Sequence, residues 1–67
     1  MAPRRLATML RERREQAGLT QETLAKRAKV ARGYLAKLEA GHSKNPSIAT
    51  LKRLTRALGV SVGELLE

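Results

Sequence analysis

Residues 20–41, TQETLAKRAKVARGYLAKLEAG, constrain this chain more than any other stretch, because two short apolar patterns follow each other there with little between them. Leu24 and Ala28 recur at helical spacing in the first pattern, and Leu35 and Leu38 recur at helical spacing in the second. The few residues between the patterns are too short for anything but a tight corner. The sequence therefore predicts two short helices joined at an angle.

Helical spacing continues through the rest of the chain, and no segment of useful length alternates with period two. We expect one all-α domain over residues 1–67, with helices over residues 3–17, 21–28, 32–40 and 48–58 and a short fifth helix after residue 61. The expected signals at the ends are the N-caps Thr20 and Ser47, the terminating glycines Gly18, Gly41 and Gly59, and a capping box of Ser61 and Glu64. The apolar stripes of the first and fourth helices are expected to be Leu6, Met9, Leu10 and Ala17, and Ile48, Leu51, Leu54 and Leu58.

Charge narrows the class of partner. Fourteen Lys and Arg face six Asp and Glu, and a net charge of +8 on 67 residues favours a polyanion. With no cysteine and one histidine, His42, neither a metal nor a cofactor is expected. No apolar run would span a membrane and no secretory signal begins the chain, so the expected setting is cytoplasmic, and nucleoid-associated when DNA is bound.

The helix expected over residues 32–40 has an unusual outer side. When Leu35 and Leu38 face inward, the outward set contains small residues and one lysine, with an arginine on the flank: Gly33, Ala36, Lys37, Ala40 and Arg32. Small residues let a helix approach another surface closely, while arginine and lysine can reach guanine O6 and N7 and an alanine methyl can touch thymine. We therefore expect Arg32, Gly33, Ala36 and Lys37 at the base edges of DNA. A solvated face and a protein-docking face are the alternatives.

Two charges fall on inward stripes, where apolar residues are expected. Arg14 lies four residues after Leu10, and Glu39 lies four residues after Leu35. A lone buried charge is costly, but two opposite charges can pair. The sequence predicts a structural Arg14–Glu39 salt bridge between the first and third helices; the alternative is two independent solvated charges.

Three polar residues are candidates for contacts with DNA phosphates. Gln21 stands in the first turn of a helix, where free backbone N–H groups favour an anion. Lys44 and Asn45 stand in the polar loop before the fourth helix. Ordinary solvated polar positions are the alternative for all three.

Taken in order and spacing, these residues resemble the phage repressor and Cro type of helix-turn-helix, also called the XRE family, over about residues 6–66. The matching pieces are Leu10 with Arg14, Gly18-Leu19-Thr20-Gln21, Leu24-Ala25, Val30, Tyr34-Leu35, Leu38-Glu39 with Gly41, Asn45-Pro46-Ser47, and Thr50-Leu51 through Leu58-Gly59-Val60-Ser61 to Leu65. The resemblance implies a five-helix DNA-binding domain in which the position of Gln21 contacts phosphate. It also implies that the positions of Arg32, Gly33 and Lys37 lie at base edges, and that the Arg14–Glu39 pair is a feature of the family.

The chain departs from the family pattern around the corner. Lys29 stands where glycine is usual, and since a left-handed lysine costs about 1 kcal/mol, a relaxed corner is expected. Ala31 replaces the usual Ser or Thr cap, which forfeits about 1 kcal/mol. Gly33 offers no hydrogen-bonding group, so we expect few base-specific contacts.

The function that this implies is a transcriptional regulator, in particular a repressor, that binds double-stranded DNA. It would bind a near-palindromic operator as a two-fold dimer with half-sites about 34 Å apart. The candidate dimer contacts are Val60, Val62 and Leu66. The alternative is a protein-interaction module, such as an antitoxin, on the same fold. An enzyme is not expected, because the sequence has no nucleophile–base pattern and no paired carboxylates in an apolar setting.

Overall fold

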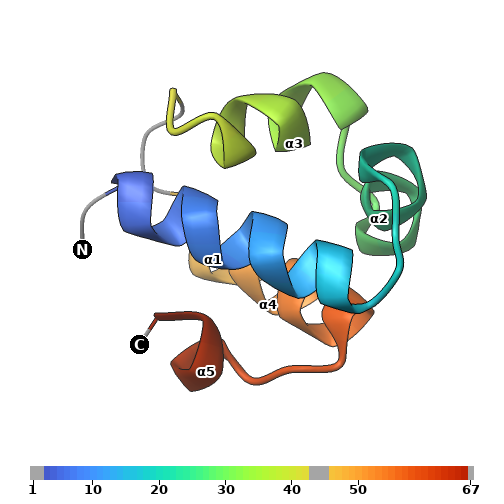
Figure 1. Cartoon of the computed structure of the whole chain (residues 1–67). Helices are drawn as coiled ribbons and strands as arrows, with labels where there is room; N and C mark the ends of the chain where they lie inside the picture. The colour runs from blue at the N-terminus through green and yellow to red at the C-terminus, as the bar shows by residue number, and fades with distance from the viewer. Residues whose placement is uncertain (1–2, 43–45, 67) are drawn as a thin grey trace.

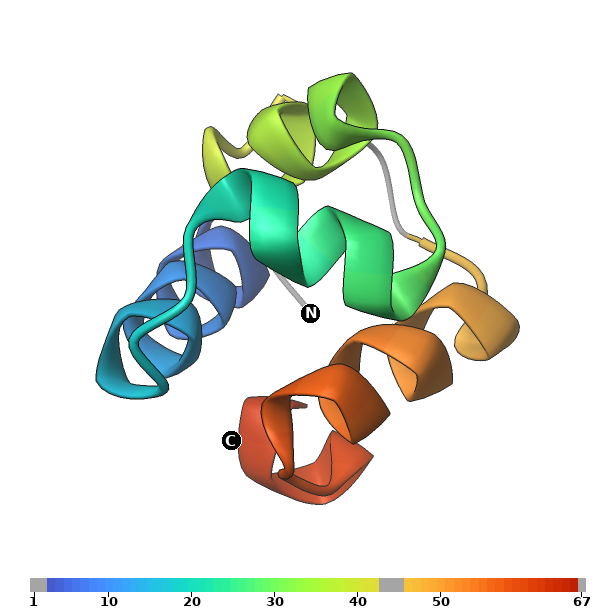
Figure 2. The same cartoon turned by 90° about the vertical axis from the view of Figure 1, so that its right-hand side faces the viewer.

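The computed structural model describes residues 3–42 and 46–66, with side chains for residues 5–42 and 46–65, and over these ranges the chain forms five α-helices. They are α1 (Pro3–Gln16), α2 (Gln21–Ala28), α3 (Arg32–Glu39), α4 (Ile48–Leu58) and α5 (Val62–Leu66). In Figures 1 and 2, α3 runs along one side of the molecule, and α4 lies on the far side of α1 and α2 from it. The expected all-α architecture is confirmed. None of the helices over the described residues is long and apolar enough to cross a membrane.

The helix starts follow the capping signals of the sequence. Thr20 Oγ1 accepts a hydrogen bond from the backbone N–H of Thr23 at 3.0 Å, and Ser47 Oγ accepts from Thr50 at 3.1 Å. At α5 the Ser61 hydroxyl accepts from the Glu64 N–H while the Glu64 carboxylate accepts from the Ser61 N–H, which is the predicted capping box. These side chains fix where α2, α4 and α5 begin.

The ends of α1 to α4 share one backbone arrangement, in which a residue with positive φ follows the helix and the next N–H bonds back to a carbonyl of the last turn. Glycine occupies this position after three of the helices, with φ of 73°, 76° and 74° at Gly18, Gly41 and Gly59. After α2 the residue is Lys29, with φ 59° and ψ 44°. The relaxed corner expected from the sequence is therefore wrong. Val30 N–H still bonds to Ala25 O at 3.0 Å, so the tight corner forms and the lysine takes the strained conformation.

Replacing Lys29 by glycine is expected to raise the free energy of unfolding by about 1 kcal/mol, because glycine adopts the left-handed conformation without a Cβ clash. The measurement is chemical denaturation of both proteins. Lys29→Ala is the control, since it shortens the side chain but keeps the Cβ, and its stability should stay near that of the parent. Equal stabilities of Lys29→Gly and Lys29→Ala would show that the corner carries no strain.

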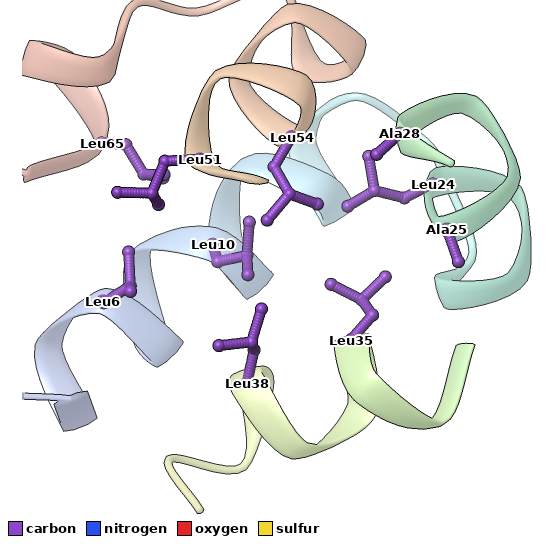
Figure 3. Close-up of a cluster of buried hydrophobic side chains, with 10 residues drawn as sticks. All are labelled: Leu6, Leu10, Leu24, Ala25, Ala28, Leu35, Leu38, Leu51, Leu54 and Leu65. Atoms are coloured by element: carbon purple, nitrogen blue, oxygen red, sulfur yellow. The ribbon is translucent and has the colours of Figure 1, made fainter. Parts of the chain in front are cut away.

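The core is a cluster of leucines and alanines at the centre of the five helices (Figure 3). Each helix contributes one leucine whose side chain is fully buried: Leu10, Leu24, Leu35, Leu54 and Leu65. Fully burying a leucine contributes about 1.5–3 kcal/mol, so these side chains dominate the cohesion of so small a domain. Leu35 and Leu38 point from α3 into this cluster, which fixes the side of α3 that remains outside.

Two residues predicted to face inward do not. Ala17 is exposed because α1 ends at Gln16, so helical spacing no longer sets the direction of its side chain. Ile48 is 62% exposed because it is the first residue of α4 and lies outside the cluster that surrounds Leu51 and Leu54. A residue in the first turn of a helix can fit the helical period and still be left uncovered by the neighbouring helices.

Candidate nucleic-acid interface

The outer side of α3 has the composition that the sequence predicts. Arg32, Gly33, Lys37 and Ala40 are exposed and Ala36 is half-buried, while the leucines of the opposite side are buried. A Cβ built on Gly33 meets no atom within 4 Å, so the surface there is open. The arrangement is a smooth strip of small side chains with one cation towards each end of the helix.

The N-terminus of α3 is left without a side-chain cap. Ala31 holds the backbone of an N-cap, with φ −70° and ψ 139°, but its side chain has no oxygen to accept a hydrogen bond from the first turn. No acidic residue stands in that turn, and Arg32 is its first residue. Unpaired N–H groups and the positive end of the helix dipole then lie beside a cation on the outer side, which favours an anionic neighbour.

The Glu39 carboxylate ties three helices together. It lies on α3 with a side chain only 2% exposed, and it accepts from Arg14 of α1, whose side chain is 12% exposed. The donors are Arg14 Nε at 2.7 Å and Arg14 Nη2 at 3.0 Å, a bidentate pair, and Gln21 Nε2 of α2 at 3.1 Å. Arg14 Nη1 also donates to the Leu19 carbonyl at 2.8 Å. The predicted salt bridge between α1 and α3 is confirmed.

Gln21 has a partner that the sequence did not predict. Its side chain is half-buried, and its amide nitrogen donates to Glu39, a residue 18 positions further along the chain. The signal was present in the inward position of Glu39, since a carboxylate has more acceptor sites than one arginine fills. The phosphate contact of Gln21 stays a prediction, and any such contact must use the remaining N–H of the amide or the backbone of the first turn.

The hydrogen bond with Glu39, supported by its negative charge, raises the pKa of the Arg14 guanidinium above its ordinary value, against the opposing effect of burial. Since folding raises this pKa, the arginine's contribution to stability is fully present below the ordinary arginine pKa and is lost only as pH rises through the raised value. The guanidinium therefore stays charged throughout the neutral and moderately alkaline range.

Truncating Arg14 to alanine is expected to lower the free energy of unfolding by about 3 kcal/mol, because it leaves the Glu39 carboxylate buried without its ion-pair partner. Denaturant unfolding measures the change. Arg11→Ala removes an exposed arginine of the same helix and should stay within about 0.5 kcal/mol of the parent. A denaturation midpoint of Arg14→Ala equal to that of the parent would contradict a structural role for the pair.

The remaining predicted site residues are placed only in part. Lys44 and Asn45 lie outside the described residues. Val60 and Val62 are half-buried at the start of the C-terminal segment, and Leu66 belongs to α5 but its side chain lies outside those described. His42 is exposed after α3. In the part of the chain with described side chains, no three His, Asp or Glu residues gather as metal ligands would.

Sequence reasoning missed one gathering of charge. Arg27 and Lys29, at the end of α2 and the corner, line a hollow together with Arg53 and Arg56 of α4. Arg27 and Arg53 are 26 positions apart in the chain, so no local pattern connects them. Taken alone, Arg53 and Arg56 indicate only a solvated helix face. Only the packing of α2 against α4 brings the four cations together.

Comparison with known proteins shows which family has this sequence pattern. The family model described as helix-turn-helix matches residues 10–65. The transcriptional regulator DdrOP3 of Deinococcus deserti is 40% identical over 63 residues, which are 94% of this chain and 48% of that protein. The immunity repressor protein of Bacillus phage phi105 is 40% identical over 53 residues, 79% of this chain and 36% of the repressor. The chain thus spans about half of the first relative and about a third of the second.

Solved structures agree with the family. The restriction-modification controller protein C.AhdI from Aeromonas hydrophila matches with a TM-score of 0.89 and 35% identity over 94% of each chain. SinR, a master regulator for biofilm formation solved in complex with DNA, matches with a TM-score of 0.89 and 34% identity over 92% of this chain and 98% of that one. The same arrangement occupies 34% of hydroxypropylphosphonic acid epoxidase from S. wedmorenis, at a TM-score of 0.86 and 30% identity. By the match of its sequence over residues 10–65 and the geometry of α2 and α3, this chain belongs to the helix-turn-helix family, of the phage repressor and Cro (XRE) type.

Proposed function

We propose that this chain is the DNA-binding part of a transcriptional regulator, acting as a repressor in the cytoplasm, with α3 entering the major groove of double-stranded DNA. The observation that carries the proposal is the smooth outer side of α3, with Arg32 and Lys37 towards its two ends. A helix fits the width of the major groove, and small residues allow the close approach that base contacts need. The net charge of +8 supplies the attraction to phosphates that does not depend on sequence.

The fixed orientation of α3 supports the same role. Base contacts demand that side chains be held to a small fraction of a base-pair step. Leu35 and Leu38 hold α3 against the core from behind, and Glu39 fastens its C-terminal turn to α1 and α2 through Arg14 and Gln21. The DNA bound to SinR, and the names of the relatives as transcriptional regulator and immunity repressor, agree with this use of the fold.

In this arrangement Lys37 and Arg32 make base contacts, with Gly33 and Ala36 at the same edges. Gln21, Lys44 and Asn45 would contact phosphates. Lys37 is exposed in the last turn of α3, where the negative end of the helix dipole stabilises its charge. Because Ala31 and Gly33 bring no polar side chain, sequence discrimination depends on few contacts.

Selection from random duplex DNA, repeated at two salt concentrations, identifies the preferred site. On that site Lys37→Ala is expected to weaken binding about tenfold or more, because a base contact by a charged side chain is worth about 1–3 kcal/mol. On a scrambled duplex of equal length the loss should be much smaller. Lys52→Ala removes an equal charge from an exposed position of α4 and should lower both affinities alike. A protein-docking role for α3 would instead leave weak DNA binding that Lys37→Ala does not change.

We also propose that two copies bind a near-palindromic operator, with contacts through Val60, Val62 and Leu66. The two valines are half-buried, so each leaves apolar surface available to a second copy. A patch of this size is small compared with the area that stable dimers bury, which favours pairing only on DNA.

Sedimentation velocity at micromolar concentration tests the pairing. The free protein should sediment as a monomer, and two copies should bind the selected duplex. Val62→Asp, which puts a charge into the proposed contact, should weaken binding of the second copy more than binding of the first, whereas Lys52→Asp should weaken both alike. A dimer without DNA contradicts pairing driven by DNA, and a single copy on the selected duplex contradicts the dimer.

A further inference from the structure

A basic hollow of about 270 Å³ lies between α2 and α4, away from the outer side of α3. Its lining consists of four cations and two alanines: Arg27, Ala28, Lys29, Arg53, Arg56 and Ala57. Figure 2 shows α2 in the middle of the view with α4 below it, and α3 above α2, on the side away from α4. No residue of α3 lines the hollow.

The hollow exists because alanines form its floor. Ala28 is 1% exposed and Ala57 is half-buried, so neither fills the space between the two helices. The four long cationic side chains that surround them are all exposed. No acidic residue lines the hollow, and among the described side chains none of the four cations forms an ion pair.

Helix dipoles account for only part of this charge. Arg27 and Arg56 stand in the last turns of α2 and α4, where a cation is favoured by the negative end of the helix. Arg53 stands in the middle of α4 and gains nothing from the dipole. Lys29 lies past the end of α2 and holds a conformation that glycine adopts at the three equivalent helix ends.

Lys29 therefore destabilises the fold at the position where it adds a cation to the hollow. A strained backbone that persists in a folded protein points to a role for the residue that holds it. The strain and the hollow are independent observations, and they meet at the same side chain.

We propose that this hollow is a second binding site for phosphate, occupied by the backbone of a nucleic acid. Three guanidinium groups match the oxygens of phosphates by paired hydrogen bonds, and the ammonium of Lys29 adds a fourth positive charge. The choice of a nucleic acid rests on the proposed function, whereas phosphate binding rests on the hollow alone. A protein that holds one duplex under α3 then engages another stretch of backbone, of the same or a second molecule, between α2 and α4.

Titration with inorganic tripolyphosphate, followed by NMR of the backbone amides of the full chain, tests the site. The shifts should concentrate at residues 27–29 and 53–57, and residues 32–37 should change little. Lys29→Gln and Arg56→Gln should each weaken tripolyphosphate binding about tenfold, as expected for the loss of a charged hydrogen-bond donor. Shifts centred on α3 would overturn the proposal.

Lys26→Gln is the matched control. Lys26 is an exposed lysine of α2 that does not line the hollow, so its loss removes the same charge. The affinity of this variant for tripolyphosphate should change less than about twofold, as for a solvent-screened charge that makes no direct contact with the ligand. Equal losses in Lys26→Gln and Lys29→Gln would mean that only the overall charge matters, which overturns a built site.

Lys29→Gly separates a lost site from a damaged fold. It should melt at a higher temperature than the parent and still bind tripolyphosphate more weakly. A Lys29→Gly protein that melts higher and keeps the parent's affinity would overturn the part assigned to the lysine.

The nature of the occupant is tested with a scrambled duplex and with a polyglutamate peptide of similar charge. Lys29→Gln and Arg56→Gln should weaken binding of the duplex more than Lys26→Gln does, and polyglutamate should not displace tripolyphosphate. A duplex that is insensitive to the hollow variants limits the site to free phosphates, and tight binding of polyglutamate points to an acidic protein; either result overturns a nucleic acid. If Lys37→Ala bound the selected duplex as tightly as the parent does, the proposed function would be wrong, while the tripolyphosphate result would still stand.

Discussion

The carboxylate of Glu39 is the point on which the geometry of α3 depends. A leucine core fixes how closely a helix packs but constrains its sliding and rotation less, because apolar contacts have little direction. Glu39 adds direction, since its two oxygens accept from Arg14 of α1 and Gln21 of α2 at distances of 2.7–3.1 Å. With only 2% of its side chain exposed, the carboxylate has no alternative partner in water. The C-terminal turn of α3 is therefore fixed to both neighbouring helices at one place.

This arrangement is suited to a chain of 67 residues. So short a chain buries only about 60% of its unfolded surface, and its core is correspondingly thin. Each helix contributes one fully buried leucine, and the outer side of α3 contributes nothing to the core. The residues of that outer side are consequently free to be chosen for what they contact, which explains how Gly33 can stand in the first turn of α3 despite its conformational cost.

The sequence predicted most of the fold because its signals are local. Thr20, Ser47 and Ser61 each cap a helix through a hydrogen bond to a residue three positions away. The Arg14–Glu39 pair was also predictable, because two charges on inward stripes must compensate each other. The prediction that Ile48 faces inward was wrong, because the helical period indicates the side on which a residue lies but not how far the neighbouring helices extend. The inward position of Glu39 indicates a donor besides Arg14, but the choice of Gln21 depends on packing, which no local pattern encodes. The hollow between α2 and α4 depends on packing in the same way.

The conformation of Lys29 could not be predicted from backbone propensity alone. The left-handed preference of glycine predicts that a lysine would relax the corner, yet the bond from Val30 N–H to Ala25 O keeps it tight. The apolar contacts of α2 and α3 explain the result, since Leu24 and Leu35 are both fully buried and a relaxed corner would withdraw one of them. Burying a leucine is worth about 1.5–3 kcal/mol and a left-handed lysine costs about 1 kcal/mol, so the core decides the backbone. The strain is thus confined to one exposed residue, and its charge lies where α2 meets α4 and away from the surface that α3 presents.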